Sequence, residues 1–182
     1  MPNSNILVHL ICGSTGAGKS TYSRELAERI GAMRFSLDEW MSQLFWMDRP
    51  EPLYPEWALE RVRRCEEQIW STVLGATALG VPCVLDWGFS RAEKRTCYFS
   101  RAAAAGLSAQ LHFVDLSAAE RWRRVQSRND QMRATNPLPF SVTREMFDFV
   151  EGLWEPPSQE EMRLYRGITV DSSGTVSHRH EA

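Results

Sequence analysis

One short stretch decides the fold of this chain: Gly13-Ser14-Thr15-Gly16-Ala17-Gly18-Lys19-Ser20, with the pattern G-x-x-x-x-G-K-S. It follows the apolar run 6–12 and leads into the amphipathic stretch 19–30, which are the strand and the helix that this pattern requires. Its glycines allow consecutive backbone N–H groups to turn toward one anion, and the helix N-terminus adds further unpaired donors. The stretch therefore predicts a site for the phosphates of a nucleotide.

The side chains of this loop have separate expected roles. Lys19 is expected to reach the β- and γ-phosphates, and the hydroxyl of Ser20 is expected to bind Mg²⁺. A glycine-rich turn without a ligand is the alternative, but a chance match to this pattern is rare in a chain of this composition. The residues expected to contact the nucleotide are Gly13, Ser14, Thr15, Gly16, Ala17, Gly18, Lys19, Ser20 and Thr21.

Length and composition indicate one globular domain. The 182 residues are 43% hydrophobic and 24% charged, which suits a single domain with a sizeable core. The net charge of −2 gives no sign of a standing nucleic-acid or membrane surface. The apolar run near the N-terminus is too short for a signal or membrane helix, so we expect a cytoplasmic protein without a membrane partner.

Strands and helices are predicted to alternate along the chain. Such crossovers are what parallel strands need, so the sequence predicts an α/β fold with a parallel sheet and helices on both faces. The expected strands are 6–12, 32–37, 81–86, 111–116 and 167–171, and the expected helices are 19–30, 39–47, 56–78, 91–105, 118–128 and 142–153. In helix 56–78 the predicted buried stripe is Leu59, Val62, Ile69, Val73 and Leu74.

Two aspartates end predicted strands and are expected to meet the loop. The carboxyl ends of parallel strands share one edge of the sheet, so Gly13, Asp38 and Asp86 should converge on one crevice. Asp38 is a candidate general base for the proton of an acceptor hydroxyl, or else the N-cap of the following helix. Asp86 is a candidate to orient Mg²⁺ through water or to hold the acceptor, or else a turn residue.

Arginines of the segment 118–128 could supply the positive charge that phosphoryl transfer needs. Arg124 and Arg128 are four residues apart and therefore point from one helix face. A solvated arginine-rich face is the alternative for this segment, which also carries Arg121 and Arg123. Trp40 and Trp87 each lie beside a candidate carboxylate and could stack on a substrate ring, although packing in the core is the usual role of tryptophan.

Four segments together resemble one group of proteins: 13–20, 35–39, 85–91 and 124–129. They look like those of small P-loop kinases of the AAA-type ATP-binding family. These are similar to the 5′-kinase domain of polynucleotide kinases, and more distantly to chloramphenicol phosphotransferases, gluconate kinases and zeta toxins. The resemblance covers roughly residues 6–170. It implies a three-layer fold with a five-stranded parallel sheet in the order 2-3-1-4-5, in one domain spanning 1–182. A helical lid at about 118–141 and a tail at 172–182 complete the expected domain.

The resemblance also implies roles for individual residues. Asp38 matches the general base, Asp86 matches the acidic residue after the third strand, and Arg124 and Arg128 match lid arginines. ATP is the implied nucleotide, with its adenine near the last strand and the lid helix. The residues expected at the acceptor are Asp86, Trp87, Arg91 and Trp40, and those expected at the metal are Ser20 and Asp86.

One departure from the family pattern bears on the substrate. Polynucleotide kinases of this type tend to carry an arginine three positions after the base, where this chain has Met41. We therefore expect an ATP- and Mg²⁺-dependent kinase that phosphorylates a hydroxyl of a small molecule, with a polynucleotide 5′-hydroxyl kinase as the first alternative. A non-catalytic or hydrolysing nucleotide-binding regulator is the second. Against a hydrolysing switch, the chain lacks N-K-x-D and an Asp-Glu pair after the third strand.

Overall fold

The computed structural model describes residues 6–52, 54–135, 141–171 and 174–179. Within them a single sheet has the strand order β2-β3-β1-β4-β5-β6. Its parallel strands are β1 (Val8–Cys12), β2 (Met33–Ser36), β3 (Cys83–Gly88), β4 (Ala109–Val114) and β5 (Ile168–Val170). The predicted α/β class and the order 2-3-1-4-5 are confirmed.

The sheet has one strand more than the sequence predicts. β6 (Val176–Arg179) pairs antiparallel with β5 and lies within the stretch 172–182, which the sequence predicts as a tail. Asp171 closes the turn before it, because its Oδ1 accepts a hydrogen bond from the N–H of Thr175 at 3.1 Å. The tail prediction is wrong for 176–179, while 172–173 and 180–182 lie outside the described residues.

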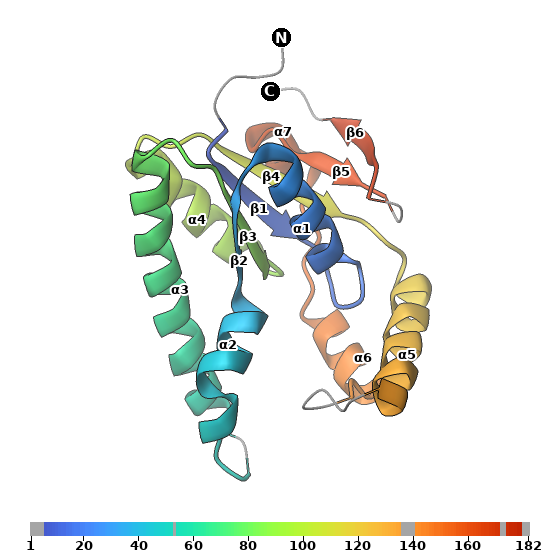
Figure 1. Cartoon of the computed structure of the whole chain (residues 1–182). Coiled ribbons are helices and arrows are strands. Elements are labelled where there is room, and N and C mark those ends of the chain that lie inside the picture. The colour runs from blue at the N-terminus through green and yellow to red at the C-terminus, as the bar shows by residue number, and fades with distance from the viewer. Residues whose placement is uncertain (1–5, 53, 136–140, 172–173, 180–182) are drawn as a thin grey trace.

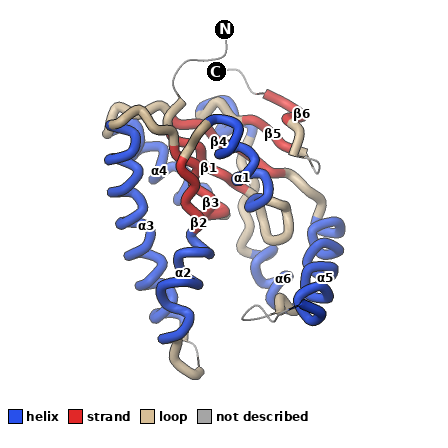
Figure 2. The backbone as a smooth tube through the Cα atoms, viewed as in Figure 1, coloured by secondary structure: helices blue, strands red, loops and turns tan. Residues whose placement is uncertain are grey.

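Helices cover both faces of the sheet, as Figures 1 and 2 show. α1 (Lys19–Ile30) packs on one face, and α3 (Pro55–Ala78) and α4 (Ala92–Ala104) pack on the other. The core is divided accordingly into two clusters. The smaller cluster lies between the sheet and α1 and includes Ile11 and Leu26. The larger lies between the sheet and α3 and α4 and includes Leu10, Ile69 and Phe99.

The buried face of α3 differs in part from the predicted stripe. Ile69 and Val73 are fully buried, and Val62 packs partly buried against the larger cluster. Leu59 and Leu74 are 66% and 39% exposed, so their predicted burial is wrong. The first half of α3 extends past the sheet and packs on a neighbouring helix instead (Figure 1), which leaves Leu59 facing solvent.

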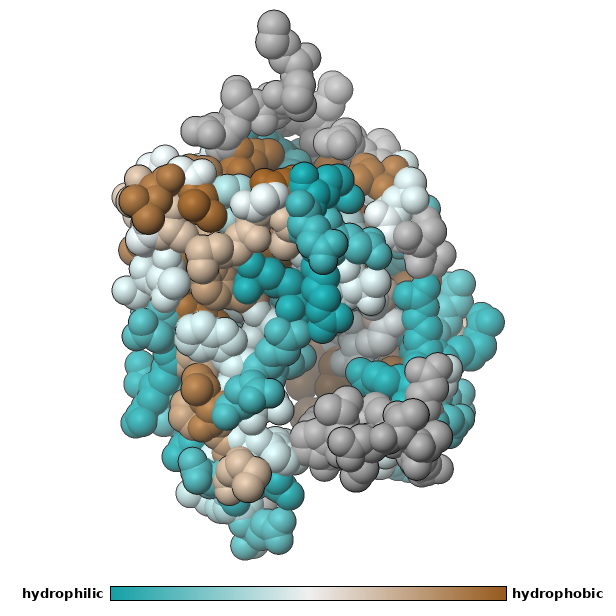
Figure 3. Space-filling model, in the orientation of Figure 1, coloured by the Kyte–Doolittle hydropathy of each residue, from teal (hydrophilic) through white to brown (hydrophobic). Residues whose placement is uncertain are grey.

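Two helical arms project beyond the carboxyl ends of the strands (Figure 1). The first arm consists of α2 (Leu37–Phe45), the 3₁₀ helix η1 (Trp46–Asp48) and the first half of α3. The second arm consists of α5 (Ala118–Thr135) and α6 (Arg144–Gly152). The surface is hollowed between them (Figure 3). α7 (Gln159–Leu164), which the sequence analysis misses, starts with a capping box at Ser158.

The second arm coincides with most of the predicted lid. α5 continues to Thr135, so the predicted end of this helix at 128 is too early. Good helix formers such as Gln131, Met132 and Ala134 favour the longer helix. Residues 136–140 of the predicted lid lie outside the described residues. None of the described helices is long and apolar enough to cross a membrane.

A buried arginine fixes the segment that follows β3. Arg95 of α4 is 0% exposed and forms a forked ion pair with Glu161 at 2.8 and 3.0 Å. It also donates to the carbonyl oxygens of Phe89 and Glu155. Because a buried charge is costly without partners, this set of bonds holds the end of β3 firmly beside the glycine-rich loop.

Candidate active site

The loop between β1 and α1 contains glycines at positions that leave no room for a side chain. Gly16 and Gly18 have φ angles of 80° and 98°, in the left-handed region that favours glycine. A Cβ atom on Gly16 would lie 2.6 Å from the carbonyl oxygen of Arg121. The N–H of Gly13 donates to the carbonyl oxygen of Gly88 at 3.1 Å. The loop is therefore held between β3 and α5 in one shape.

The N-terminus of α1 is available for an anion. Its N-cap is Gly18, and no side chain caps the first turn. The first N–H groups of a helix have no partner within the helix, and they carry the positive end of the helix dipole. Together with the preceding loop they form the arrangement that binds phosphate in P-loop proteins.

Lys19 lies between the loop and the two candidate carboxylates. Its Nζ donates to the carbonyl oxygen of Ser14 at 3.0 Å. Burial lowers the pKa of Lys19, while the nearby charges of Asp86 and Asp38 raise it and offset part of that effect. The two aspartates that the sequence predicts to converge on the loop are thus within electrostatic reach of each other and of Lys19.

Asp38 occupies the first turn of α2 without capping it. The N-cap of α2 is Ser36, whose Oγ accepts a hydrogen bond from the N–H of Glu39. The alternative interpretation of Asp38 as the cap is therefore wrong. The carboxylate of Asp38 forms no hydrogen bond with any residue that the structure describes. Part of the residue is exposed, but the protein packed around its carboxyl raises the pKa of Asp38, and Lys19 and Arg128 act in the opposite direction.

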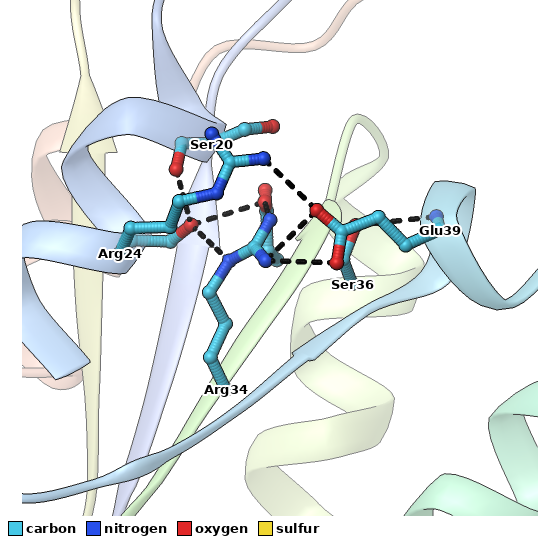
Figure 4. Close-up of polar contacts among 7 residues, drawn as sticks. Ser20, Arg24, Arg34, Ser36 and Glu39 are labelled. Atoms are coloured by element: carbon cyan, nitrogen blue, oxygen red, sulfur yellow. Dashed lines mark hydrogen bonds and ion pairs between the residues drawn. The ribbon is translucent and has the colours of Figure 1, made fainter.

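Asp86 is buried near the end of β3 and is already engaged by two side chains. Its Oδ2 lies 3.0 Å from Ser23 Oγ and accepts a hydrogen bond from Arg34 Nη2 at 2.6 Å. Arg34 also donates to both carboxylate oxygens of Glu39 (Figure 4). Asp86 is thus a strand residue in an ion-pair network, and the alternative interpretation as a turn residue is wrong.

Arg124 and Arg128 of α5 both lie near the residues of the site. Arg124 Nη1 donates to the carbonyl oxygen of Ala17 at 3.3 Å, and Arg128 is close enough to Asp38 to lower its pKa. Arg121 is different, because it is buried and pairs with Glu151 at 2.5 Å. Arg121 also donates to the carbonyl oxygen of Thr15 at 3.5 Å, so it supports the loop while it joins α5 to α6.

The remaining residues expected at the acceptor have partners within the protein. Trp87 is 9% exposed and packs against Phe89 and Tyr98, so the expectation that it offers a ring face to a substrate is wrong. Trp40 is half-buried and meets Phe35 edge to face. Arg91 is exposed, and its Nη1 is 2.7 Å from Glu155 Oε1.

A cavity of about 250 Å³ opens beside the loop. It lies between the start of α1, Arg124 of α5 and the turn that follows β5, which is where the family resemblance implies the adenine. Of the lining residues, Ala17, Gly18, Thr21 and Arg124 are predicted from the sequence, and the others are not. The residues that line the cavity are Ala17, Gly18, Thr21, Tyr22, Glu25, Val114, Arg124, Asp171 and Gly174.

Comparison with known proteins identifies the family. A family model described as AAA domain matches residues 8–153, so the chain belongs to that family. No curated protein sequence matches the chain. Among solved structures, a protein from Chloroflexus aurantiacus whose assignment as a kinase is provisional has a TM-score of 0.70 and 16% identity. The match covers 93% of this chain and 89% of that one.

Two further structures extend the likeness. The APS kinase of Mycobacterium tuberculosis in complex with AMPPNP and APS has a TM-score of 0.55 and 14% identity, over 93% of this chain and 90% of that one. A gluconokinase from Sinorhizobium meliloti 1021 has a TM-score of 0.52 and 18% identity, over 93% and 85%. The fold is therefore that of small P-loop kinases, and the resemblance to these proteins is confirmed.

Proposed function

We propose that the protein is an ATP-dependent kinase that transfers the γ-phosphoryl group to a hydroxyl of a small-molecule acceptor. The observation that carries this proposal is the position of the Asp38 carboxyl, which lies beside the loop and within electrostatic reach of Lys19. Asp38 is accessible, has no hydrogen-bond partner among the described residues, and has a raised pKa. A carboxylate in such a position suits a general base for an incoming hydroxyl.

The other residues of the site supply binding and charge stabilisation. The loop amides and the N-terminus of α1 hold the triphosphate, and Lys19 turns from Ser14 to the β- and γ-phosphate oxygens. Arg124 and Arg128 bring positive charge from the second arm. The base of ATP occupies the cavity beside Arg124, with Thr21 next to the phosphate that is nearest the ribose.

Ser20 and Asp86 are the residues that would hold Mg²⁺. Both offer oxygen atoms, which are the donors that Mg²⁺ prefers. Ser20 would bind it directly. Asp86 would act through water, because its Oδ2 is already engaged by Ser23 and Arg34. When bound, Mg²⁺ would neutralise charge on the phosphate oxygens.

In the transfer step, Asp38 accepts the proton of the acceptor hydroxyl. The hydroxyl oxygen forms a bond to the γ-phosphorus, while the bond from that phosphorus to the β,γ-bridging oxygen breaks and ADP leaves. The chain's own contribution is to align the acceptor with the triphosphate and to stabilise the charge that develops between them.

A small acceptor is favoured over a nucleic-acid 5′ end. Met41, at the position where polynucleotide kinases tend to carry an arginine, packs against Cys65 with the two sulfur atoms 4.0 Å apart. The same arm presents Phe45 and Trp46, and its Arg63 and Arg64 are paired with Glu60. The gluconokinase and the APS kinase share this fold and support a small acceptor by analogy.

An acceptor screen with γ-labelled ATP tests the proposal. Sugars, aminoglycosides, nucleosides and 5′-hydroxyl oligonucleotides are offered to the full chain, and we expect label on one class of small molecule. Asp38→Asn should cut transfer roughly 10²–10⁴-fold with unchanged ATP affinity. Asp48→Asn, which changes an exposed carboxylate at the tip of the same arm, is the matched control and should have no effect.

Each other result contradicts a defined part of the proposal. Label on oligonucleotides alone would replace the small acceptor by a polynucleotide. Label on no acceptor would refute the kinase assignment and favour a nucleotide-binding regulator. If Asp38→Asn transfers phosphate at the wild-type rate, Asp38 is not the general base.

A further inference from the structure

One guanidinium, that of Arg34 on β2, is the centre of the polar network beside the site (Figure 4). Its side chain is only 12% exposed, and all three of its nitrogen atoms are engaged. Nε donates to Ser23 Oγ at 2.7 Å, Nη1 donates to both oxygens of Glu39 at 3.0 Å, and Nη2 donates to Asp86 Oδ2 at 2.6 Å. A single side chain therefore joins three elements in addition to its own strand.

Those three elements carry the residues on which the proposed chemistry depends. Ser23 lies in α1, one turn after Ser20, and its Oγ is 3.1 Å from the carbonyl oxygen of Ser20. Glu39 follows Asp38 in the first turn of α2. The third partner, Asp86, belongs to β3. Arg34 thus links the start of the phosphate-binding helix, the turn that bears the proposed base and the second carboxylate.

Two ion pairs of this network, Arg24–Glu39 and Arg34–Asp86, differ in their exposure to solvent. Arg24 of α1 also donates to Glu39 at 3.0 Å, but the side chains of that pair are 57% and 51% exposed. Exposed ion pairs contribute little, because water screens them and long side chains lose freedom. By contrast the carboxylate of Asp86 is 3% exposed, and a buried charge that loses its partner is strongly destabilised. The bond of Arg34 to Asp86 is therefore the firmest of the network. The same largely buried guanidinium reaches both oxygens of Glu39, whereas Arg24 reaches one.

We propose that Arg34 is a positioning residue for phosphoryl transfer. It holds Asp86 through one nitrogen and the turn bearing Asp38 through another, so that the proposed base and the phosphate-binding loop keep a fixed spacing. Arg34 acts through these partners and has no contact with ATP or acceptor of its own. The inference rests on the proposed function, because the spacing matters only if Asp38 meets an acceptor.

Three variants of the full chain test the inference. Arg34→Gln removes the fork, and Arg34→Lys keeps a charge against Asp86 but cannot also hold both oxygens of Glu39. Arg24→Gln removes a bond to the same Glu39 without touching Asp86. We expect Arg34→Gln to lower kcat by about 10–100-fold, in line with a misplacement of about 1 Å, with KM for ATP within threefold. Arg34→Lys should recover part of the loss, and Arg24→Gln should lose less than threefold.

Hydrogen exchange of the α2 amides, residues 37–45, gives a second readout that needs no acceptor. It should accelerate at least tenfold in Arg34→Gln, whereas exchange in α6 should remain as in the wild type. A wild type that transfers no label refutes the proposed function, while unchanged α2 exchange in Arg34→Gln refutes the positioning role by itself.

Other outcomes also overturn the inference. If Arg34→Gln loses ATP binding and kcat together, and Arg34→Lys does the same, Arg34 merely supports the fold. If Arg24→Gln is as damaging as Arg34→Gln, the effect belongs to Glu39 alone. If kcat of Arg34→Gln stays within threefold of the wild-type value, Arg34 is not a positioning residue for phosphoryl transfer.

Discussion

Substitution of Gly16 by alanine should damage the contact between the glycine-rich loop and α5. At this position φ is 80°, and the added Cβ would lie 2.6 Å from the carbonyl oxygen of Arg121 and 3.0 Å from Cγ2 of Val125. A non-glycine residue in the left-handed region costs about 1–3 kcal/mol. Overpacking against backbone adds about 1–3 kcal/mol, so the total is on the order of 2–6 kcal/mol.

This cost should appear in nucleotide binding as well as in stability. The loop and α5 must move apart to admit the methyl group, and α5 carries Arg124, which donates to Ala17 of the loop. A cost of about 2 kcal/mol corresponds to a loss of roughly 30-fold in affinity. We therefore expect Gly16→Ala to bind ATP at least about 30-fold more weakly or to unfold at clearly lower urea.

Gly75→Ala in α3 is the matched control. A Cβ on Gly75 would meet no atom within 4 Å, and the residue has ordinary helical geometry. Alanine should stabilise this helix by about 0.5–1 kcal/mol. Urea unfolding followed by tryptophan fluorescence and titration with ATP measure both variants. Wild-type stability together with wild-type ATP affinity in Gly16→Ala would refute the reasoning.

Two more predictions concern stability against pH and the second arm. Burial lowers the pKa of His9 to about 4, so between this value and 6.5 the unfolded state binds more protons than the folded state. The free energy of unfolding should therefore fall by about 2 kcal/mol from pH 7 to pH 5, and urea unfolding of His9→Gln should lack this share; an equal slope in both proteins would contradict it. Arg124→Ala should weaken ATP binding by roughly 10–100-fold, as expected for a hydrogen bond to a charged group, while Arg123→Ala, on an exposed neighbour, should not. Equal affinities of the two variants for ATP in a titration would show that Arg124 does not contribute to ATP binding.

Features encoded by local pattern could be predicted from the sequence. The loop at 13–20 and the alternation of apolar strands with amphipathic helices suffice for the order of the parallel strands, because right-handed crossovers leave few arrangements. The same argument predicts that Gly13, Asp38 and Asp86 meet at one edge of the sheet. β6 escapes prediction because it is short and polar and pairs antiparallel at the sheet edge.

Long-range partners could not be predicted in the same way. Whether Trp87 packs inside or faces a ligand depends on Phe89 and Tyr98, and the sequence alone does not say which side of the ring they cover. The position of Arg34 beside Asp86 could have been predicted from one feature of the sequence. The two-residue period of β2 places Arg34 and Ser36 on the face opposite Phe35, and Ser36 lies beside Asp86 in the sheet.

A structure of the protein with Mg²⁺ and a non-hydrolysable ATP analogue tests the central claim most directly. We expect the triphosphate to lie against the backbone amides of 13–20, with Lys19 moved from Ser14 to the phosphate oxygens. The carboxylate of Asp38 should face the γ-phosphate across an open space for the acceptor. A triphosphate bound elsewhere, or an Asp38 turned away from it, would contradict the account.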